Sequence, residues 1–270
     1  MIGFIGGGNM AEALIKGIRG KVGLTRFQGQ GARDDIFVSE PREERRKYLE
    51  QTYGIKTTQS NKEVASLCNL IILAVKPQDI ETVLNEIADD VTEDKSVVSI
   101  TAGITLAYLA SKLKTKKLIR VMPNTPALVQ EGISVMSLCE CLTDKDVAVV
   151  KDIFMAVGKV IVLPEKYLNA VTALSGSGPA FIAFFLEALI EAGIKAGLKD
   201  KAFELAVQTL IGTAKLLESG MTPEKLREMV TSPKGTTAAG LKVFEEKNFK
   251  ETVIAAIDAA ANRAKELGKK

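Results

Sequence analysis

The first eleven residues constrain the fold more than any other part of the chain. An apolar run, Ile2–Ile5, leads into Gly6–Ala11 (Gly-Gly-Gly-Asn-Met-Ala), and a segment with helical periodicity follows. This spacing fits G-x-G-x-x-A, the pattern of a strand-to-helix turn that binds a dinucleotide. Gly6 permits the tight turn, Gly8 lets the backbone approach a pyrophosphate, and Ala11 lets the helix pack closely on the strand. The sequence therefore predicts phosphate binding at the start of this helix.

Short β-branched runs alternate with helical patterns through the first half of the chain, which predicts an α/β fold with a mainly parallel sheet covered on both faces. The strand-like runs are Ile2–Ile5, Ile36–Ser39, Leu70–Val75, Ser96–Ile100, Leu118–Met122, Ile133–Ser137 and Lys159–Leu163. Phe27–Asp35 is predicted to be an exposed loop.

The strand signal ends near residue 163. We therefore predict a Rossmann-type dinucleotide-binding domain over 1–163 and an all-helical substrate and dimerisation domain over 164–270. Five or six helices are expected in the second domain. The breaks between them are predicted near Gly176–Pro179, Gly197–Lys199, Gly220–Pro223 and Ser232–Gly235.

Composition argues against several classes of partner. A net charge of +3 is too even to indicate nucleic acid or an anionic membrane. The segment from Pro179 to Leu198 is strongly apolar, but Glu187, Glu191 and Lys195 form one polar stripe, so we expect a buried or interface helix and not a membrane span. Glycines and an early acid interrupt any apolar signal segment at the start, which favours a cytoplasmic protein.

No metal is expected. The chain has three cysteines and no histidine, and the pair Cys139 and Cys141 lacks the further ligands that a metal site needs. Reduced cysteines in a cytoplasmic protein are the simpler interpretation.

The second predicted strand ends in residues that point to two different coenzymes. Glu40 is the kind of acid that holds the ribose 2′-hydroxyl of NAD, whereas Arg42 is the kind of residue that accommodates the 2′-phosphate of NADP. Arg45 and Arg46 share a helical face with Arg42 and can add positive potential, or all three can form an ordinary solvated face. The residues alone leave the coenzyme open.

The ends of the next strands should border the ribose and nicotinamide, because ligands of such sheets lie beyond the carboxyl ends of the strands. These ends are Ala74–Pro77, Thr101–Gly103 and Arg120–Pro126. Lys76 is either a ligand contact or a surface lysine. Two prolines bracket Asn124 and fix the backbone where a substrate can meet the nicotinamide.

The chain resembles the pyrroline-5-carboxylate reductases over essentially its whole length. The resemblance is carried by Ile5–Met10, Ala74–Pro77, Arg120–Pro126, Ala173–Pro179 (Ala-Leu-Ser-Gly-Ser-Gly-Pro) and Met229–Leu241 (Met-Val-Thr-Ser-Pro-Lys-Gly-Thr-Thr-Ala-Ala-Gly-Leu). It implies hydride transfer from NADPH, or from NADH, to the C=N carbon of 1-pyrroline-5-carboxylate, giving L-proline. It also implies a homodimer, often arranged in a ring of dimers.

The resemblance further implies which residues hold the coenzyme, at the phosphates, at the adenosine ribose and at the nicotinamide. These residues are Gly6, Gly7, Gly8, Asn9, Met10, Ser39, Pro41, Asn61, Ala74, Val75, Lys76, Pro77 and Ala102.

Substrate contacts are implied at Ser232, Gly235, Thr236, Thr237 and Asn124, with Ser232 and Thr237 as the catalytic pair. Thr237 is expected to orient the ring nitrogen. The imine can arrive already protonated, so a protein acid is not essential, and the absence of histidine is no objection. The competing structural interpretation is that Thr236 only caps a helix.

Two positions depart from the family pattern. Lys234 replaces a glycine that is common in the family's Ser-Pro-Gly-Gly stretch, which can stiffen the loop or add positive charge near the substrate. Glu40 stands where a neutral residue is common, which weakens the expectation of a strict NADPH preference.

Two rival functions remain at this point. The first is a β-hydroxyacid dehydrogenase, but Ile182 and Leu186 stand where that class has its lysine and asparagine. The second is a non-catalytic protein that binds a dinucleotide and reports redox state. Such a protein would lose the polar residues of the segment Ser232–Thr237, and here they are present.

Overall fold

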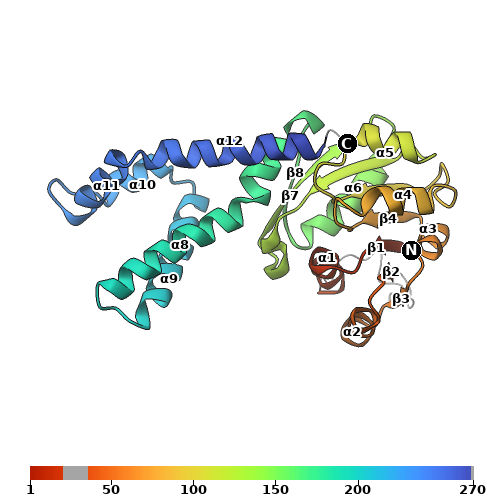
Figure 1. Ribbon diagram of the computed structural model, residues 1–270, viewed down its shortest axis with the longest axis horizontal. Coiled ribbons are helices and arrows are strands. Elements are labelled where there is room, and N and C mark those ends of the chain that lie inside the picture. Colours follow the sequence, from red (N-terminus) through yellow and green to blue (C-terminus); the bar gives the residue numbers. More distant parts are fainter. Residues whose placement is uncertain (21–35, 269–270) are drawn as a thin grey trace. The chain divides into compact units, whose positions relative to one another are not determined.

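The computed structural model describes residues 1–20 and 36–268, so the predicted loop at 27–35 lies outside the described part (Figure 1). Two compact units are formed. Unit 1 comprises Met1–Ser177 together with Ala260–Lys270, and unit 2 comprises Gly178–Ala259. The strands end before residue 163, as the sequence predicts, but the compact units separate further along the chain, and the C-terminal residues return to unit 1. The domain boundary at 163 stays a prediction.

Unit 1 is built on one eight-stranded sheet in the order β3-β2-β1-β4-β5-β6-β7-β8. Neighbouring strands are parallel except β6 and β7, which are antiparallel. The predicted mainly parallel sheet is thus confirmed. The strands are β1 Ile2–Ile5, β2 Ile36–Ser39, β3 Lys56–Thr58, β4 Leu70–Leu73, β5 Ser96–Ser99, β6 Leu118–Met122, β7 Gly132–Leu138 and β8 Gly158–Val162.

The strand order 3-2-1-4-5-6 is that of a doubly wound dinucleotide-binding domain, and it reverses direction between β1 and β4. A ligand is expected beyond the carboxyl ends of these two strands. The turn after β1 begins at Gly6 and the turn after β4 begins at Ala74, so the topology brings two predicted site segments together.

Helices cover both faces of the sheet (Figure 1). One core contains Leu14, Leu49 and Phe154, and the other contains Val64, Leu84 and Leu109. Both cores are mainly aliphatic because continuous apolar strands bury side chains on each face. The helices of unit 1 before β8 are α1 Asn9–Gly20, α2 Glu43–Tyr53, α3 Asn61–Leu67, α4 Ile80–Ile87, α5 Leu106–Lys112, the 3₁₀ turn η2 Thr125–Val129 and α6 Asp144–Met155.

In the described residues after β8, all regular secondary structure is helical. The 3₁₀ turn η3 Glu165–Tyr167, helix α7 Leu168–Val171 and the π-helical turn η4 Thr172–Gly176 come first, followed by α8 Gly178–Lys195, α9 Lys201–Glu218, α10 Pro223–Met229, α11 Thr236–Glu246 and α12 Phe249–Leu267. The predicted breaks fall between these helices. The break at Gly176–Pro179 is a change from π-helical to α-helical winding, because the Ser177 N–H donates to the Thr172 carbonyl, five residues back.

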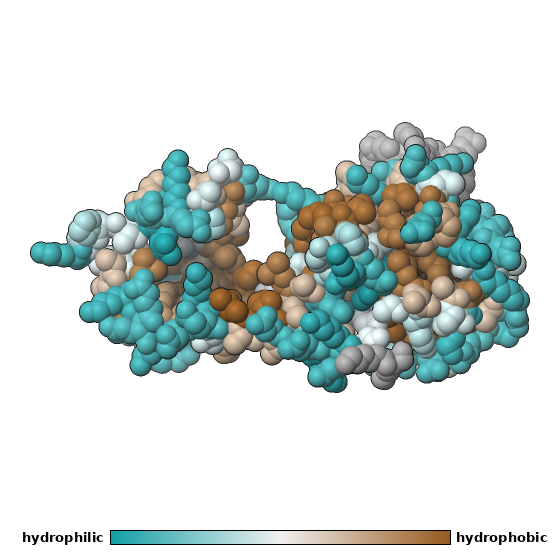
Figure 2. All heavy atoms as spheres, turned by 90° about the horizontal axis from the view of Figure 1, so that it is seen from above, coloured by the Kyte–Doolittle hydropathy of each residue, from teal (hydrophilic) through white to brown (hydrophobic). Residues whose placement is uncertain are grey.

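Unit 2 buries almost nothing within one chain. Of the buried hydrophobic residues in the described part, Ala202 is the only one in this unit, while large apolar side chains such as Phe184 and Phe203 are exposed. Figure 2 shows hydrophobic surface on these helical segments. A half-exposed aromatic group, formed by Phe185, Phe244 and Phe249, is the nearest thing to a core. Unit 2 therefore offers a large apolar surface to a partner.

Candidate active site

The glycine-rich turn after β1 has the geometry that its sequence predicts. Gly6 adopts a φ of +98°, and a Cβ there would lie 2.7 Å from the Ala74 carbonyl oxygen. A side chain at Gly6 would therefore both strain the backbone and collide with the adjacent turn. A Cβ on Gly8 would meet nothing within 4 Å, so the backbone there faces open space that a ligand can approach.

The backbone N–H groups of this turn divide into two sets. Gly6 donates to the Ser39 carbonyl at 2.9 Å, and Gly7 donates to Oε2 of Glu40 at 3.1 Å. Asn9 and Met10 begin helix α1, where the N–H groups have no intrahelical partner. The phosphate-facing donors are therefore expected at the start of α1, and Gly7 is held by the protein itself.

A pocket of about 290 Å³ opens beside this turn. It joins residues that lie far apart in the sequence, namely Met10, Ala74, Val75, Lys76, Pro77, Ile100, Thr101, Ala102 and Pro123. Six of these are predicted coenzyme contacts, and Lys76 is exposed. Thr101 and Pro123 belong to strand-end segments that the sequence predicts to border the ligand, whereas Ile100 was not predicted as part of the site. Thr101 fixes the rim, because its hydroxyl donates to the Val75 carbonyl at 3.1 Å.

The end of β2 brings Ser39 and Asn61 together, as the family resemblance implies. The buried Ser39 hydroxyl donates to Oδ1 of Asn61 at 2.7 Å, and the Asn61 amide donates to Glu86 at 2.8 Å. Pro41 is exposed at the beginning of the next turn. These residues lie where the adenosine ribose of a coenzyme would bind.

Glu40 is not the free acid that the sequence suggests. It is buried and accepts hydrogen bonds from the backbone of Gly7 and from both the backbone and the guanidinium of Arg42. Burial raises the pKa of Glu40, but these hydrogen bonds outweigh that effect, so its pKa lies below the ordinary glutamate value. The carboxylate therefore stays charged and tied to its neighbours.

Asn124 has a structural role that the sequence analysis did not anticipate. Its Oδ1 accepts from the Ile133 backbone at 2.8 Å, and its Nδ2 donates to the Ser175 carbonyl at 3.1 Å. Both ends of the amide are thus occupied inside unit 1. The side chain holds the start of β7 against the π-helical turn, and a substrate contact through it would require one of these bonds to open.

The predicted substrate segment, Ser232–Thr237, lies at the start of α11 in unit 2. Gly235 is the N-cap residue and Thr236 is the first helical residue, so the interpretation of Thr236 as the cap is wrong. No side chain caps this helix start. The N–H groups of its first turn and the hydroxyls of Thr236 and Thr237 are therefore suited to an anionic group such as a carboxylate.

Lys234 occupies a left-handed backbone conformation, with a φ of +63°. A glycine adopts this conformation without strain, whereas a lysine has a Cβ that crowds the neighbouring carbonyl. The position explains why glycine suits it in the family pattern, and it shows that this chain keeps the same turn with a less favourable residue.

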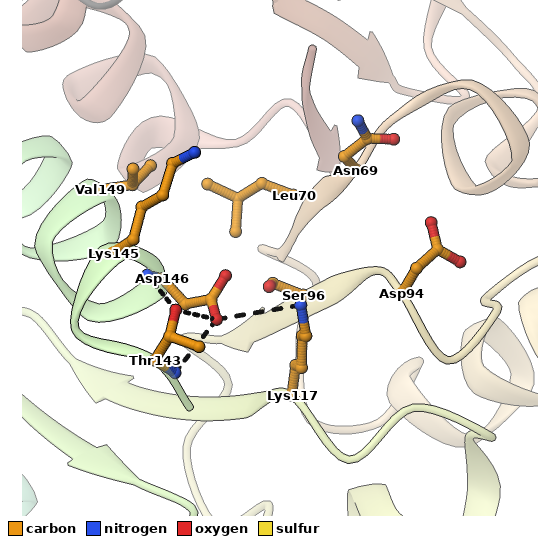
Figure 3. Close-up of a pocket in the computed structure, with 9 residues that line it drawn as sticks. All are labelled: Asn69, Leu70, Asp94, Ser96, Lys117, Thr143, Lys145, Asp146 and Val149. Atoms are coloured by element: carbon orange, nitrogen blue, oxygen red, sulfur yellow. Dashed lines mark hydrogen bonds and ion pairs between the residues drawn. The ribbon is translucent and has the colours of Figure 1, made fainter. Parts of the chain in front are cut away.

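A second pocket, of about 360 Å³, lies at the opposite edge of the sheet. Figure 3 shows Asn69, Ser96 and Lys117 around it, from the amino ends of β4, β5 and β6. Asp146 belongs to a capping box with Thr143 and lies 3.9 Å from the Lys117 ammonium. Since dinucleotides bind beyond the carboxyl ends of the strands, this pocket is not the coenzyme site.

Among residues 1–20 and 36–268, no group of three or more His, Cys, Asp or Glu side chains could hold a metal ion. The sulfur atoms of Cys139 and Cys141 lie 2.9 Å apart, and both thiols contact the Lys116 carbonyl oxygen. Burial raises the pKa of Cys141, and the neighbouring thiol adds to the effect.

One continuous helical stretch, Glu165–Lys195, is long and apolar enough to cross a membrane by length and composition alone. It includes α8, whose polar stripe is visible in the structure as the ion pair between Lys195 and Glu191 at 2.7 Å.

Comparison with known proteins agrees with this architecture. Residues 165–267 match the family described as pyrroline-5-carboxylate reductase dimerisation, and residues 1–103 match that described as NADP oxidoreductase, coenzyme F420-dependent. The chain is 40% identical to the pyrroline-5-carboxylate reductase of Synechocystis over 100% of its own length and 98% of that protein. It is 38% identical to the enzyme of Escherichia coli over 99% of its length and 98% of the relative's.

Solved structures give the same result. The pyrroline-5-carboxylate reductase of Coxiella burnetii has a TM-score of 0.87 and 36% identity, covering 100% of this chain and 98% of that one. The Plasmodium falciparum pyrroline carboxylate reductase, solved with NADP bound, has a TM-score of 0.86 and 32% identity, covering 99% and 98%. Sequence and structure agree along the entire length, and the chain belongs to the pyrroline-5-carboxylate reductase family.

Proposed function

We propose that this chain reduces 1-pyrroline-5-carboxylate to L-proline in the cytoplasm, using NADPH and accepting NADH. The observation that carries the proposal is the pocket beside the glycine-rich turn, where Met10, Val75 and Ala102 come together at the switch point of the sheet. A flat nicotinamide fits a site lined by small apolar groups and a few polar ones. When bound, the reduced nicotinamide supplies the hydride that the C=N carbon receives.

The coenzyme is held by the residues already described at the start of α1 and at the ends of β2, β4 and β5. The N–H groups of Asn9 and Met10 receive the pyrophosphate, since a helix start favours anions. Ser39 and Asn61 lie at the adenosine ribose. Lys76 is exposed at the rim, where its ammonium can meet a phosphate or the substrate carboxylate.

The substrate is held by the segment Ser232–Thr237. Its carboxylate is received by the N–H groups at the start of α11 and by the hydroxyls of Ser232 and Thr236. Thr237 accepts a hydrogen bond from the protonated ring nitrogen and donates one to the product amine. The protein's contribution is to orient the imine and stabilise its charges, so that no histidine or other strong acid is needed.

The active assembly is proposed to be a homodimer, and rings of such dimers are consistent with the apolar surface of unit 2. Helix α8 provides the main contact, because Phe184 is exposed in one chain and its neighbours Phe181 and Ile182 are also uncovered. A second copy is a better cover than a lipid bilayer, since Glu187, Glu191 and Lys195 would otherwise be placed in hydrocarbon.

Steady-state kinetics on the purified protein tests the reaction. Oxidation of NADPH should require 1-pyrroline-5-carboxylate and should produce L-proline in equal amount. A β-hydroxyacid dehydrogenase would instead oxidise hydroxy acids, and a redox-sensing protein would bind the coenzyme without turnover. Coenzyme binding with no proline formed would overturn the proposed reaction.

A further inference from the structure

We propose that Arg42 is the residue through which this chain accepts the ribose 2′-phosphate of NADPH, and that it does so by covering the acidic group of Glu40 as well as by contacting the phosphate. The inference rests on the proposed coenzyme site at the end of β2. It assigns to one named arginine the choice between a phosphorylated and an unphosphorylated ribose.

Glu40 has no acceptor position left for a ribose hydroxyl. A carboxylate offers about four acceptor sites. Oε1 accepts from the Arg42 backbone at 3.1 Å and from its Nε at 2.7 Å, and Oε2 accepts from Gly7 at 3.1 Å and from Nη2 of Arg42 at 3.3 Å. The acid that would normally select NADH is thereby occupied within the protein.

Arg42 is the most exposed of the three arginines at this end of β2, and it therefore offers its guanidinium to a phosphate most openly. Arg45 donates to the Gly7 carbonyl at 2.7 Å and pairs with Glu12 at 2.5 Å. Arg46 donates to the backbone carbonyls of Glu40 and Pro41 at 2.8 and 2.9 Å. These two arginines therefore fix the turn, whereas Arg42 is 67% exposed.

The fork between Arg42 and Glu40 leaves donors pointing away from the acid. A guanidinium carries five N–H groups, and the bonds to Glu40 use Nε and one hydrogen of Nη2. The outer N–H groups match the bidentate geometry of a phosphate, and the fork holds the planar group in one orientation. Arg42 lies two residues from Glu40, so a phosphate bound to it lies next to a neutralised pair and not next to a bare carboxylate.

Removal of Arg42 should therefore act twice. It deletes the phosphate contact, and it exposes the negative charge of Glu40 to the 2′-phosphate. The freed carboxylate can then accept from an unphosphorylated ribose. We expect Arg42→Ala to shift the ratio of NADPH to NADH affinity by about 10- to 100-fold toward NADH, the range typical of one charge-assisted hydrogen-bonded contact.

The test measures dissociation constants by calorimetry on the full chain, for NADPH, NADH, adenosine 2′,5′-bisphosphate and 5′-AMP. The last two probes differ only in the 2′-phosphate and do not depend on imine reduction. Lys47→Ala is the matched control. Lys47 is an exposed cation of α2, the helix that begins directly after its N-cap residue Arg42, and it is paired with Glu43. Its loss should leave both ratios unchanged because screening weakens distant surface charges.

Glu40→Gln in the Arg42→Ala background separates the two effects. If Arg42 masks the acid, this second change should restore part of the lost affinity for adenosine 2′,5′-bisphosphate. If the ratios of both probe pairs in Arg42→Ala equal those of the unmodified chain while the melting temperature is unchanged, the inference is wrong. Failure of the unmodified chain to bind any of the four compounds would instead overturn the proposed function, and with it this site.

Discussion

Units 1 and 2 bury their hydrophobic residues in opposite ways. Unit 1 encloses two mainly aliphatic cores on the faces of its sheet, and Phe154 and Leu84 there are fully buried. Unit 2 has a comparably apolar sequence, yet within one chain only Ala202 among its described hydrophobic residues is buried. A helical unit of this kind does not stabilise itself by burial, so its stability should depend on a second copy of the chain. Unit 1, in contrast, encloses its hydrophobic cores within one chain.

The largest expected loss of stability follows from a substitution in the core of unit 1. Phe154→Ala deletes a fully buried ring and should lower the free energy of unfolding by about 3–5 kcal/mol. Chemical denaturation should show this loss at every protein concentration, because the cavity forms inside one chain. A loss below about 1 kcal/mol, the size typical of exposed positions, would show that the core of unit 1 is not as closed as described.

A phenylalanine-to-alanine change in unit 2 should show whether its apolar surface is buried between two chains. Phe184 is 75% exposed in one chain, so Phe184→Ala would cost almost nothing in a monomer. If a partner covers it, the loss should be about 1.5–3 kcal/mol per chain, the value of burying a large apolar side chain. The melting temperature of the variant should then fall further on dilution than that of the unmodified protein. A fall that is independent of protein concentration would contradict the idea that a second copy covers Phe184.

The catalytic prediction concerns Thr237. Thr237→Ala should lower kcat/KM for the imine by about 10- to 100-fold, since a hydrogen bond to a charged group contributes about 1.5–3 kcal/mol. Coenzyme affinity should be nearly unchanged, and Thr237→Ser should keep most of the activity because the hydroxyl remains.

Thr222→Ala is the matched control for Thr237, because the Thr222 hydroxyl caps α10 by accepting from the Lys225 backbone at 3.3 Å. This control should cost about 1 kcal/mol of stability and leave kcat/KM in place. If Thr237→Ala behaves like the control, Thr237 is structural.

A smaller effect is expected at Lys234. Lys234→Gly relieves a left-handed conformation that costs about 1–2 kcal/mol in a non-glycine residue, and it loses about 0.4–1 kcal/mol through the more flexible unfolded chain. The net result should be a slightly higher melting temperature. Lys225→Gly, in the first turn of α10, should lower the melting temperature, and equal behaviour of the two variants would contradict the strain at Lys234.

The smallest expected effect is a change in how stability depends on pH, through the carboxyl group of Glu40. The pKa of Glu40 is lower in the folded protein than in the unfolded chain, where a glutamate has a pKa of about 4.3. The hydrogen bonds of its carboxylate therefore stabilise the fold fully above that pH. This contribution to stability is lost as the pH falls through the lower folded pKa. Urea titrations between neutral pH and pH 3 should show a shallower decline for Glu40→Gln than for the unmodified chain. Parallel declines would mean that Glu40 is not held as described.

Sequence patterns predicted the fold where they were strong. The sheet was predicted from apolar runs such as those of β1 and β4, because burial on both faces leaves a continuous hydrophobic signal. The turn after β1 was predicted from its glycine spacing. Strand β3 was missed for the opposite reason. It is a three-residue edge strand, Lys56–Thr58, with exposed and half-exposed side chains, and it pairs in parallel with β2.

The site was predicted in part. The glycine motif marks Met10, and strand ends mark Val75 and Ala102. The structure brings these residues into one pocket, and their contacts with the coenzyme stay predictions. The roles of Glu40 and Asn124 could not be predicted, because hydrogen bonds to Gly7 and to Ser175 join positions 33 and 51 residues away in the chain. Periodicity carries no information about such bonds.

Sedimentation velocity on a dilution series, with specific activity measured at each concentration, tests directly whether unit 2 depends on a second copy of the chain. We expect a dimer or a multiple of it at high concentration, with activity lost as the dimer dissociates, because unit 2 depends on a second copy for its core. A monomer that persists at every concentration with full imine-reducing activity would contradict it.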